Sequence, residues 1–162
     1  MRIILEGCDG TGKTTLARAL AVKYGLDVVH VTNRDSNTFD FYKQSFGKDD
    51  VIWDRNVIGE IIYPKIFRRE GKIDEIDLEY LIKRAKADGI IFLVLTTDYA
   101  TLRDRIDARG DEFAAVRNHL GEINDKFCAI ATQYDLPLID TSKISLDEIC
   151  KNYIKKEKKR HG

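Results

Sequence analysis

Eight residues near the N-terminus restrict the fold of this chain more than any other feature. They run from Gly7 to Thr14, read GCDGTGKT, and match the pattern G-x-x-x-x-G-K-[ST] in full. A short apolar run, 3–5, precedes them, and a stretch with helical character begins at Lys13. A glycine-rich turn between a strand and a helix points backbone N–H groups and the positive end of the helix dipole at one place. The sequence therefore predicts a phosphate-binding turn.

Each residue type in this turn has a chemical role toward a polyphosphate. Glycines let phosphate oxygens approach the main chain closely. The Lys13 ammonium is a cation for the transferred phosphate, and the Thr14 hydroxyl is a ligand for Mg²⁺. We therefore expect ATP as phosphoryl donor and Mg²⁺ as cofactor. The residues expected to hold them are Gly7, Cys8, Asp9, Gly10, Thr11, Gly12, Lys13 and Thr14.

The order of apolar runs predicts an α/β fold. Short apolar runs alternate with longer amphipathic stretches, which is typical of a parallel sheet with crossover helices. The expected strands are 3–5, 28–31, 51–53, 90–95 and 136–139. The expected helices are 13–23, which ends at Gly25, then 57–69, which Pro64 kinks or interrupts, and 73–87.

One further helix is predicted from an apolar stripe with alternating steps of three and four residues. The stripe consists of Phe113, Val116, Leu120, Ile123, Phe127, Ile130 and Tyr134. Residues 33–50 are expected to form a loop with a short helical piece. This segment carries four aromatic residues that either line a ligand pocket or hold the loop to the core, namely Phe39, Phe41, Tyr42 and Phe46.

Composition excludes several classes of function. The 162 residues suit one domain, and 27 basic residues balance 27 acidic ones, so no general attraction to nucleic acid or anionic membranes is expected. The longest apolar run, 90–95, is too short to span a membrane, and the N-terminus lacks a signal-peptide pattern, which indicates a cytoplasmic protein.

The basic segment 155–160 is interpreted as a solvated helix end. The three cysteines and three histidines are scattered, so we expect no disulfide framework or metal cluster, and the histidines should be solvated or packed.

Asp54 and Arg55 stand where phosphoryl transfer needs an acceptor site. They follow the run 51–53 and so lie at the carboxyl end of a strand, the edge where open α/β sheets bind ligands. Asp54 is suited to accept a hydroxyl proton or to hold magnesium-bound water, and Arg55 to bind an acceptor phosphate through two hydrogen bonds. A surface ion pair is the alternative interpretation.

Arg105 and Arg109 lie four residues apart, on one helix face, just before Gly110. We interpret 103–117 as a short lid that closes over ATP, excludes water and neutralises charge. An exposed helix stabilised by ion pairs between neighbouring turns remains the alternative.

These three patches resemble the thymidylate kinase-like branch of the P-loop nucleotide kinases. The run 5–15 is similar to that family's E-G-x-D-G-x-G-K-T-T signature, which adds Thr15 to the nucleotide site. The Asp54-Arg55 pair is similar to its D-R motif, and Arg105-x-x-x-Arg109-Gly110 is similar to its lid. The resemblance implies a three-layer P-loop NTPase fold of the nucleoside monophosphate kinase type, formed by residues 1–162 as a single domain. It also implies a five-stranded parallel sheet in the order 2-3-1-4-5.

The resemblance also implies roles for individual residues. Asp9 would contact the acceptor's sugar hydroxyl and Arg55 the acceptor phosphate. Gly10 stands where some members carry an arginine, which implies that the lid supplies the catalytic cations. The expected catalytic residues are Lys13, Asp54, Arg105 and Arg109, and the expected acceptor-binding residues are Asp9, Asp54, Arg55 and Tyr42.

The chain departs from the family pattern around the acceptor. Asn56 and Gly59-Glu60 stand where relatives often show an aromatic residue and a serine, and Asn33-Arg34-Asp35 is the nearest counterpart of the R-E-P segment that reads thymine. A deoxynucleoside monophosphate kinase, with dTMP as acceptor, is the leading hypothesis. A deoxynucleoside kinase acting on a sugar 5′-hydroxyl and an ATP-binding module without turnover stay open, as does a homodimer.

Overall fold

A five-stranded parallel sheet lies at the centre of the computed structural model, which describes residues 1–32, 36–110 and 114–154. The strand order is β2-β3-β1-β4-β5, which confirms the order implied by the family resemblance. The strands are β1 Arg2–Gly7, β2 Asp27–His30, β3 Val51–Asp54, β4 Ile91–Thr96 and β5 Leu138–Asp140. Each expected strand is therefore present, shifted by no more than two residues at either end.

The register of the sheet brings the ends of the central strands together. Leu5 of β1 is paired with Asp54 of β3 on one side and with Leu93 of β4 on the other. All pairs are parallel, so the turn after Gly7 and the residues after Asp54 emerge at the same edge. This edge is where ligands bind in open α/β sheets.

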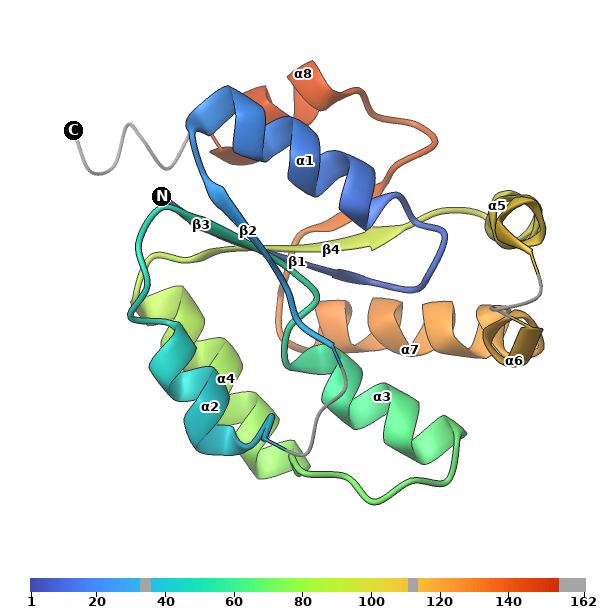
Figure 1. The fold of residues 1–162 in the computed structure, drawn as a ribbon, viewed down its shortest axis with the longest axis horizontal. Coiled ribbons are helices and arrows are strands. Elements are labelled where there is room, and N and C mark those ends of the chain that lie inside the picture. The colour runs from blue at the N-terminus through green and yellow to red at the C-terminus, as the bar shows by residue number, and fades with distance from the viewer. Residues whose placement is uncertain (33–35, 111–113, 155–162) are drawn as a thin grey trace.

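Helices cover both faces of the sheet (Figure 1). One face carries α1 (Lys13–Tyr24) and α8 (Leu146–Ile149), which is followed by the π-helical turn η2 (Cys150–Ile154). The other carries α2 (Phe39–Ser45), α3 (Ile58–Ile66), α4 (Glu75–Ala87) and α7 (Leu120–Gln133). Helices α5 (Tyr99–Arg109) and α6 (Ala114–Arg117) lie beyond the carboxyl ends of the strands. The three layers are those expected for this fold.

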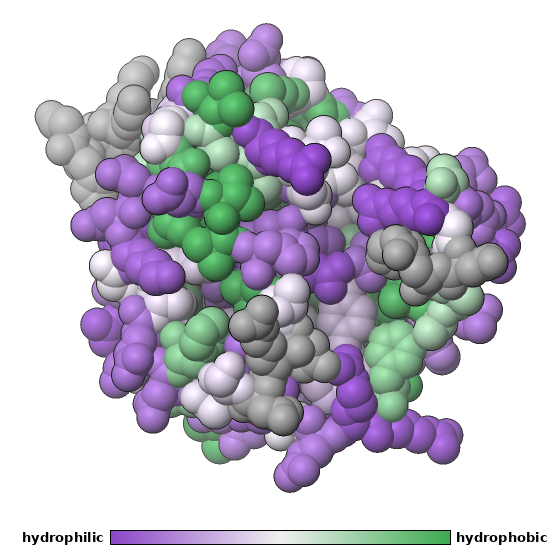
Figure 2. Space-filling model, in the orientation of Figure 1, coloured by the Kyte–Doolittle hydropathy of each residue, from purple (hydrophilic) through white to green (hydrophobic). Residues whose placement is uncertain are grey.

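The two faces of the sheet bury two apolar clusters. Trp53 and Phe127 are among the largest side chains buried on the face of α7, and Leu20 and Leu93 belong to the cluster under α1. The outer surface is mostly hydrophilic in the view of Figure 2, with hydrophobic side chains gathered over α1 and β2. Within the described residues, no helix is both long and apolar enough to span a membrane.

The single helix predicted from the apolar stripe is wrong, because the structure has two helices there. The chain forms α6 and α7 instead, separated by a turn in which His119 N donates to the Val116 carbonyl over 2.9 Å. Leu120, Ile123 and Phe127 of α7 are buried together, and Val116 of α6 packs partly buried against the same cluster, so the apolar stripe is retained across the break. Apolar periodicity alone does not reveal such a turn, because the stripe continues on both sides of it. Phe113 lies outside the described residues.

Of the two outcomes expected at Pro64, a kink or an interruption, the interruption is wrong. Helix α3 continues through Pro64 and ends at Ile66, short of the expected boundary at residue 69. Proline lacks the N–H that would bond four residues back. Here it lies in the last turn, where Arg69 N donates to the Pro64 carbonyl over 2.8 Å and only two helical residues follow.

Candidate active site

The turn after β1 is shaped by glycines that no other residue replaces easily. Gly7 has φ +147°, and a Cβ there would lie 2.6 Å from the Leu95 carbonyl oxygen. Gly12 has φ +89° and precedes α1, whose first turn has no side-chain cap. The N–H groups at the start of α1 therefore remain available to a ligand.

Lys13 is held inside the turn. Its side chain is 5% exposed, and Nζ donates to the Gly7 carbonyl over 2.7 Å and to the Cys8 carbonyl over 2.9 Å. Burial lowers the pKa of Lys13, and the charge of Asp54 acts in the opposite direction. The ammonium group thus lies beside the turn, within reach of an anion that displaces a carbonyl partner.

Asp54 connects β3 with the start of α1. Thr14 Oγ1 donates to Asp54 Oδ2 over 2.8 Å, and His30 Nδ1 lies 3.1 Å from the same oxygen. Asp54 is buried, and its other oxygen, Oδ1, has no hydrogen-bond partner in the described part of the chain. His30 is 53% exposed, as expected for a solvated histidine, and it also contacts Asp54 through Nδ1.

A magnesium ion is implied by the fold family, and the oxygens of Thr14 and Asp54 fit it. Mg²⁺ prefers hard oxygen ligands and usually keeps waters while binding one or two carboxylates together with substrate phosphates. The unpartnered Asp54 Oδ1 is such an oxygen. Among the described residues, no group of three or more His, Cys, Asp and Glu side chains could hold a metal by itself. Thr14 and Asp54 would supply one hydroxyl and one carboxylate oxygen to such an ion.

Three cavities meet along the carboxyl edge of the sheet. The first, the loop cavity, has a volume of about 170 Å³ and is lined by Asp9, Gly10, Gly12, Lys13, Thr14, His30, Asp54, Arg55 and Arg109. The second, the α1–α8 cavity, has a volume of about 600 Å³ and is lined by Thr11, Gly12, Thr15, Leu16, Ala19, Arg105, Ala108, Arg109, Thr141, Ile144, Leu146 and Ile149.

The third cavity, the Tyr42 cavity, has a volume of about 200 Å³. It is lined by Asp9, Val31, Thr32, Tyr42, Arg55, Asn56, Gly59, Glu60, Tyr63, Pro64, Phe67, Arg69 and Val116. The cavities share residues: Gly12 and Arg109 line both the α1–α8 and the loop cavity, while Asp9 and Arg55 line both the loop and the Tyr42 cavity. The loop cavity therefore lies between the other two.

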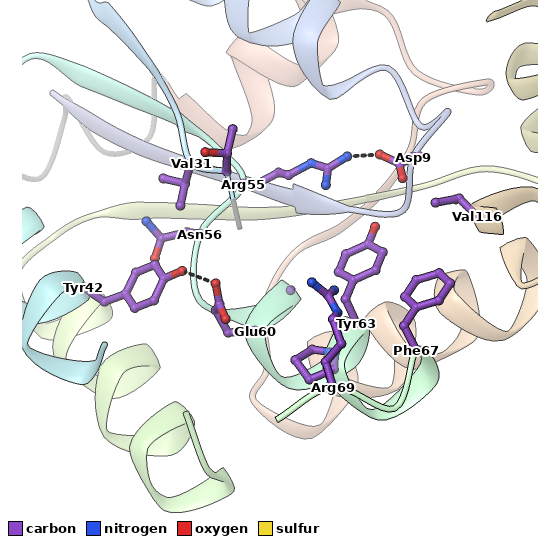
Figure 3. A pocket seen from close by; sticks show the side chains of 13 residues that line it. Asp9, Val31, Tyr42, Arg55, Asn56, Glu60, Tyr63, Phe67, Arg69 and Val116 are labelled. Carbon is purple, nitrogen blue, oxygen red and sulfur yellow. Dashed lines mark hydrogen bonds and ion pairs between the residues drawn. The ribbon is translucent and has the colours of Figure 1, made fainter. Parts of the chain in front are cut away.

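Arg55 and Asp9 form an ion pair at the boundary of the Tyr42 cavity (Figure 3). Arg55 has φ +73°, an uncommon conformation for a residue with a side chain, and its guanidinium lies 5.7 Å from the centre of the Tyr63 ring. The fold thus holds a cation between the phosphate-binding turn and the third cavity, at some cost in backbone strain.

Two roles were expected for the aromatic residues of 33–50, lining a ligand pocket or holding the segment to the core, and Tyr42 fills both. It is fully buried and lines the Tyr42 cavity, where its hydroxyl donates to Glu60 Oε1 over 3.0 Å. The other three aromatic residues line none of the three cavities. Phe46 packs against Trp53 and Phe39 against Tyr80, so these two hold the segment to the core.

Glu6 is a site residue that sequence reasoning missed. It is buried at the end of β1 and accepts hydrogen bonds from the backbone N–H groups of Asn56 and Gly59. Burial raises the pKa of Glu6 to about 7, although these hydrogen bonds act in the opposite direction. Its carboxylate fixes the start of α3, which carries Glu60 and Tyr63. The only signal was the glutamate before the first glycine.

The remaining predicted residues are distributed as follows. Cys8 contributes its carbonyl, but its thiol points away toward the Leu120 carbonyl, and burial raises the pKa of the thiol to about 11. Thr11 and Thr15 line the α1–α8 cavity, not the loop cavity. Thr141, which sequence reasoning also missed, donates through Oγ1 to the Thr11 carbonyl over 2.8 Å and lines the same cavity.

Part of the expected lid, 103–117, contacts the phosphate-binding turn. Arg105 Nη1 donates to the Gly10 carbonyl over 2.8 Å, so α5 contacts the phosphate-binding turn directly. Arg109 lines two cavities, and Arg117 of α6 pairs with Asp107. Residues 111–113, in the middle of the expected lid, lie outside the described residues.

Known proteins resemble this chain in sequence and in architecture. No protein-family model matches the chain. It is 25% identical to the probable thymidylate kinase of Methanocaldococcus jannaschii, over 92% of this chain and 91% of that one. It is 28% identical to the SPbeta prophage-derived uncharacterized protein YorR of Bacillus subtilis, over 94% and 96%.

Two solved structures have the same fold. The crystal structure of YorR in complex with phosphorylated GDP gives a TM-score of 0.82, at 24% identity, over 99% of this chain and 98% of that one. A deoxyadenosine kinase from M. mycoides, solved with dCMP and dCDP, gives 0.58, at 18% identity and the same coverage. A probable thymidylate kinase and a deoxyadenosine kinase are among these proteins, and the turn and the sheet order agree with the likeness. The chain is therefore similar in sequence and in fold to P-loop nucleotide kinases.

Proposed function

We propose that this protein transfers the γ-phosphoryl group of ATP to a nucleoside or deoxynucleoside monophosphate. One observation supports this most strongly: the loop cavity shares two residues with each neighbouring cavity. A phosphate chain in the loop cavity therefore has a site for its own nucleoside on one side and a site for an acceptor on the other. Such an arrangement supplies the positioning on which phosphoryl transfer depends.

The donor would occupy the α1–α8 cavity with its adenosine and the loop cavity with its phosphates. The backbone N–H groups at the start of α1 would bind phosphate oxygens, and Lys13 would exchange its carbonyl partners for the terminal phosphate. Thr14 and Asp54 would hold the magnesium ion, which supplies charge neutralisation when bound. Arg105 and Arg109 approach from α5 and would neutralise charge that develops during transfer.

The acceptor would occupy the Tyr42 cavity. Arg55 would bind the acceptor phosphate with its guanidinium and place it next to the loop cavity. Asp9, released from its ion pair with Arg55, would accept a hydrogen bond from the sugar hydroxyl. A monophosphate is favoured over a nucleoside because Arg55 places a cation at the entrance from the loop cavity.

The resemblance to thymidylate kinases and the archaeal relative make dTMP the first acceptor to test. The solved relatives contain other nucleotides, phosphorylated GDP in YorR and dCMP in the deoxyadenosine kinase. The acceptor base therefore depends on the side chains of the Tyr42 cavity, which differ from the thymidylate kinase pattern at Asn56 and Glu60.

A coupled assay of ADP release tests the proposal with eight nucleoside monophosphates and the matching nucleosides. We expect turnover with at least one monophosphate and formation of the diphosphate. Turnover with nucleosides alone would establish a nucleoside kinase instead. Tight binding of Mg-ATP without any phosphorylated product would establish an ATP-binding module.

A further inference from the structure

The Tyr42 cavity contains a buried carboxylate, Glu60, for which phosphoryl transfer has no use. Glu60 is only 8% exposed and lies on the first turn of α3. The Tyr42 hydroxyl donates to its Oε1 over 3.0 Å, and Asn37 Nδ2 lies 3.5 Å from the same oxygen. Both contacts end on Oε1, so Glu60 is oriented by its neighbours. Oε2 keeps its capacity to accept hydrogen bonds, and Oε1 can accept from a ligand in place of the longer contact with Asn37.

Two more polar groups in this cavity point to a ligand. Asn56 Nδ2 and Tyr63 Oη are buried and have no hydrogen-bond partner in the described part of the chain. Both residues line the Tyr42 cavity, in which apolar side chains such as Phe67 supply a surface for a flat ring (Figure 3). A buried polar group without a partner is unfavourable, so a ligand that supplies partners gains affinity here.

The pattern of acceptors and donors distinguishes the common bases. Guanine presents two N–H donors side by side, N1–H and the 2-amino group, which match the two oxygens of one carboxylate. Thymine presents a single N–H between two carbonyl oxygens, so a carboxylate that accepts from N3–H also faces a lone pair. Adenine and cytosine place a ring nitrogen acceptor beside their amino group.

We propose that Glu60 selects the acceptor base by accepting hydrogen bonds from the two adjacent N–H donors of guanine. The preferred acceptor is then a guanosine or deoxyguanosine monophosphate, ahead of dTMP. This inference rests on the proposed function only in taking the Tyr42 cavity as the acceptor site. It requires binding of the base and makes no use of turnover.

Calorimetric titration of the protein with dGMP, dIMP and dTMP, without ATP, tests the proposal. We expect dGMP to bind at least ~10-fold more tightly than dTMP, because one well-placed pair of hydrogen bonds discriminates by about 1–3 kcal/mol. The base of dIMP lacks the 2-amino group, so its affinity should fall between the two. Equal or tighter binding of dTMP would overturn the proposal.

Substitution of Glu60 makes the test specific to this side chain. In Glu60→Gln, an amide N–H replaces one acceptor oxygen, so dGMP should bind at least ~10-fold more weakly while dTMP binding stays within ~3-fold. Glu79→Gln, an exposed change on α4, is the matched control and should leave both affinities unchanged. An equal loss for dGMP and dTMP in Glu60→Gln would show that Glu60 supports the cavity without reading the base.

Tyr42→Phe provides a milder variant. It removes one of the donors that orient Glu60 but leaves the carboxylate in place, so the preference for dGMP should decrease without disappearing. Failure of this proposal and failure of the proposed function are distinguishable. A preference for dGMP without any phosphorylated product would contradict the function alone, whereas turnover of dTMP with no preference for dGMP would contradict this inference alone.

Discussion

The phosphate-binding turn and the Tyr42 cavity are adjacent but built in opposite ways. The turn comes from one continuous segment, 7–14, whose shape follows from its own glycines and from the start of α1. The Tyr42 cavity is assembled from the segments that follow β1, β2 and β3 and from α2, α3 and α6. A local motif therefore suffices for a phosphate chain that all nucleotides share, while selection of an acceptor needs side chains brought together by the fold.

The two regions also differ in how their polar groups are satisfied. In the turn, Lys13 and Thr14 have partners within the site, at Gly7, Cys8 and Asp54. In the Tyr42 cavity, Asn56 and Tyr63 carry buried polar atoms without a partner among the described residues. A ligand at the turn would replace existing hydrogen bonds of Lys13 and Thr14, whereas a ligand in the Tyr42 cavity would add hydrogen bonds to Asn56 and Tyr63.

The largest effect is expected in the turn. Replacing Lys13 by Ala should lower turnover at least ~100-fold, because it removes a transition-state donor worth about 3 kcal/mol. Steady-state kinetics at saturating ATP and acceptor measures it. Lys23→Ala, near the end of the same helix, is the control and should keep normal turnover. Near-normal activity of Lys13→Ala would remove this lysine from the mechanism.

Glu6, which joins the two regions, should make stability depend on pH. Its folded-state pKa of about 7 lies above the usual 4.5, so between these values the native state binds more protons than the unfolded state. The stabilisation linked to Glu6 is complete below about pH 4.5 and is lost as pH rises through about 7, by about 3 kcal/mol in total. Urea unfolding across this range should show a steeper fall for the natural protein than for Glu6→Gln. Parallel curves for the two proteins would contradict the raised pKa.

At the boundary between the regions, Arg55→Ala should weaken the acceptor. A charged hydrogen-bonding group contributes about 1.5–3 kcal/mol, so the KM for the acceptor should rise roughly 10- to 100-fold while the KM for ATP changes little. Arg84→Ala, an exposed change on α4, serves as the control. A rise in the KM for ATP alone would move Arg55 to the donor side.

The smallest effect concerns the unpartnered hydroxyl of Tyr63. Because Tyr63→Phe removes a buried polar group without a partner, the free energy of unfolding should stay the same or rise by up to about 1 kcal/mol in the absence of ligand. Thermal unfolding compared with Tyr99→Phe, an exposed position, measures this. A loss of stability would show that the hydroxyl already has a partner in the folded protein.

The same contrast explains what the sequence could predict. The turn, the five strands and the placement of Asp54 and Arg55 follow from short-range patterns, because one segment or one strand end determines each of them. The roles of Glu6 and Glu60 could not be predicted from their positions in the sequence alone, since these roles depend on contacts with residues up to 53 positions away. The break between α6 and α7 was missed because an apolar stripe reports burial and not helix continuity.

The central claim is that the loop cavity, which would hold the phosphates, connects the α1–α8 cavity with the Tyr42 cavity. Binding of a bisubstrate ligand tests this claim most directly. The ligand would be adenosine linked through five phosphates to a deoxynucleoside, titrated calorimetrically against the protein. If the α1–α8 and Tyr42 cavities both open onto the loop cavity, one ligand molecule should bind per chain. Its affinity should be at least ~100-fold higher than that of ATP, because the second half of the ligand binds without a further loss of translational freedom. Affinity no greater than that of ATP would contradict the account.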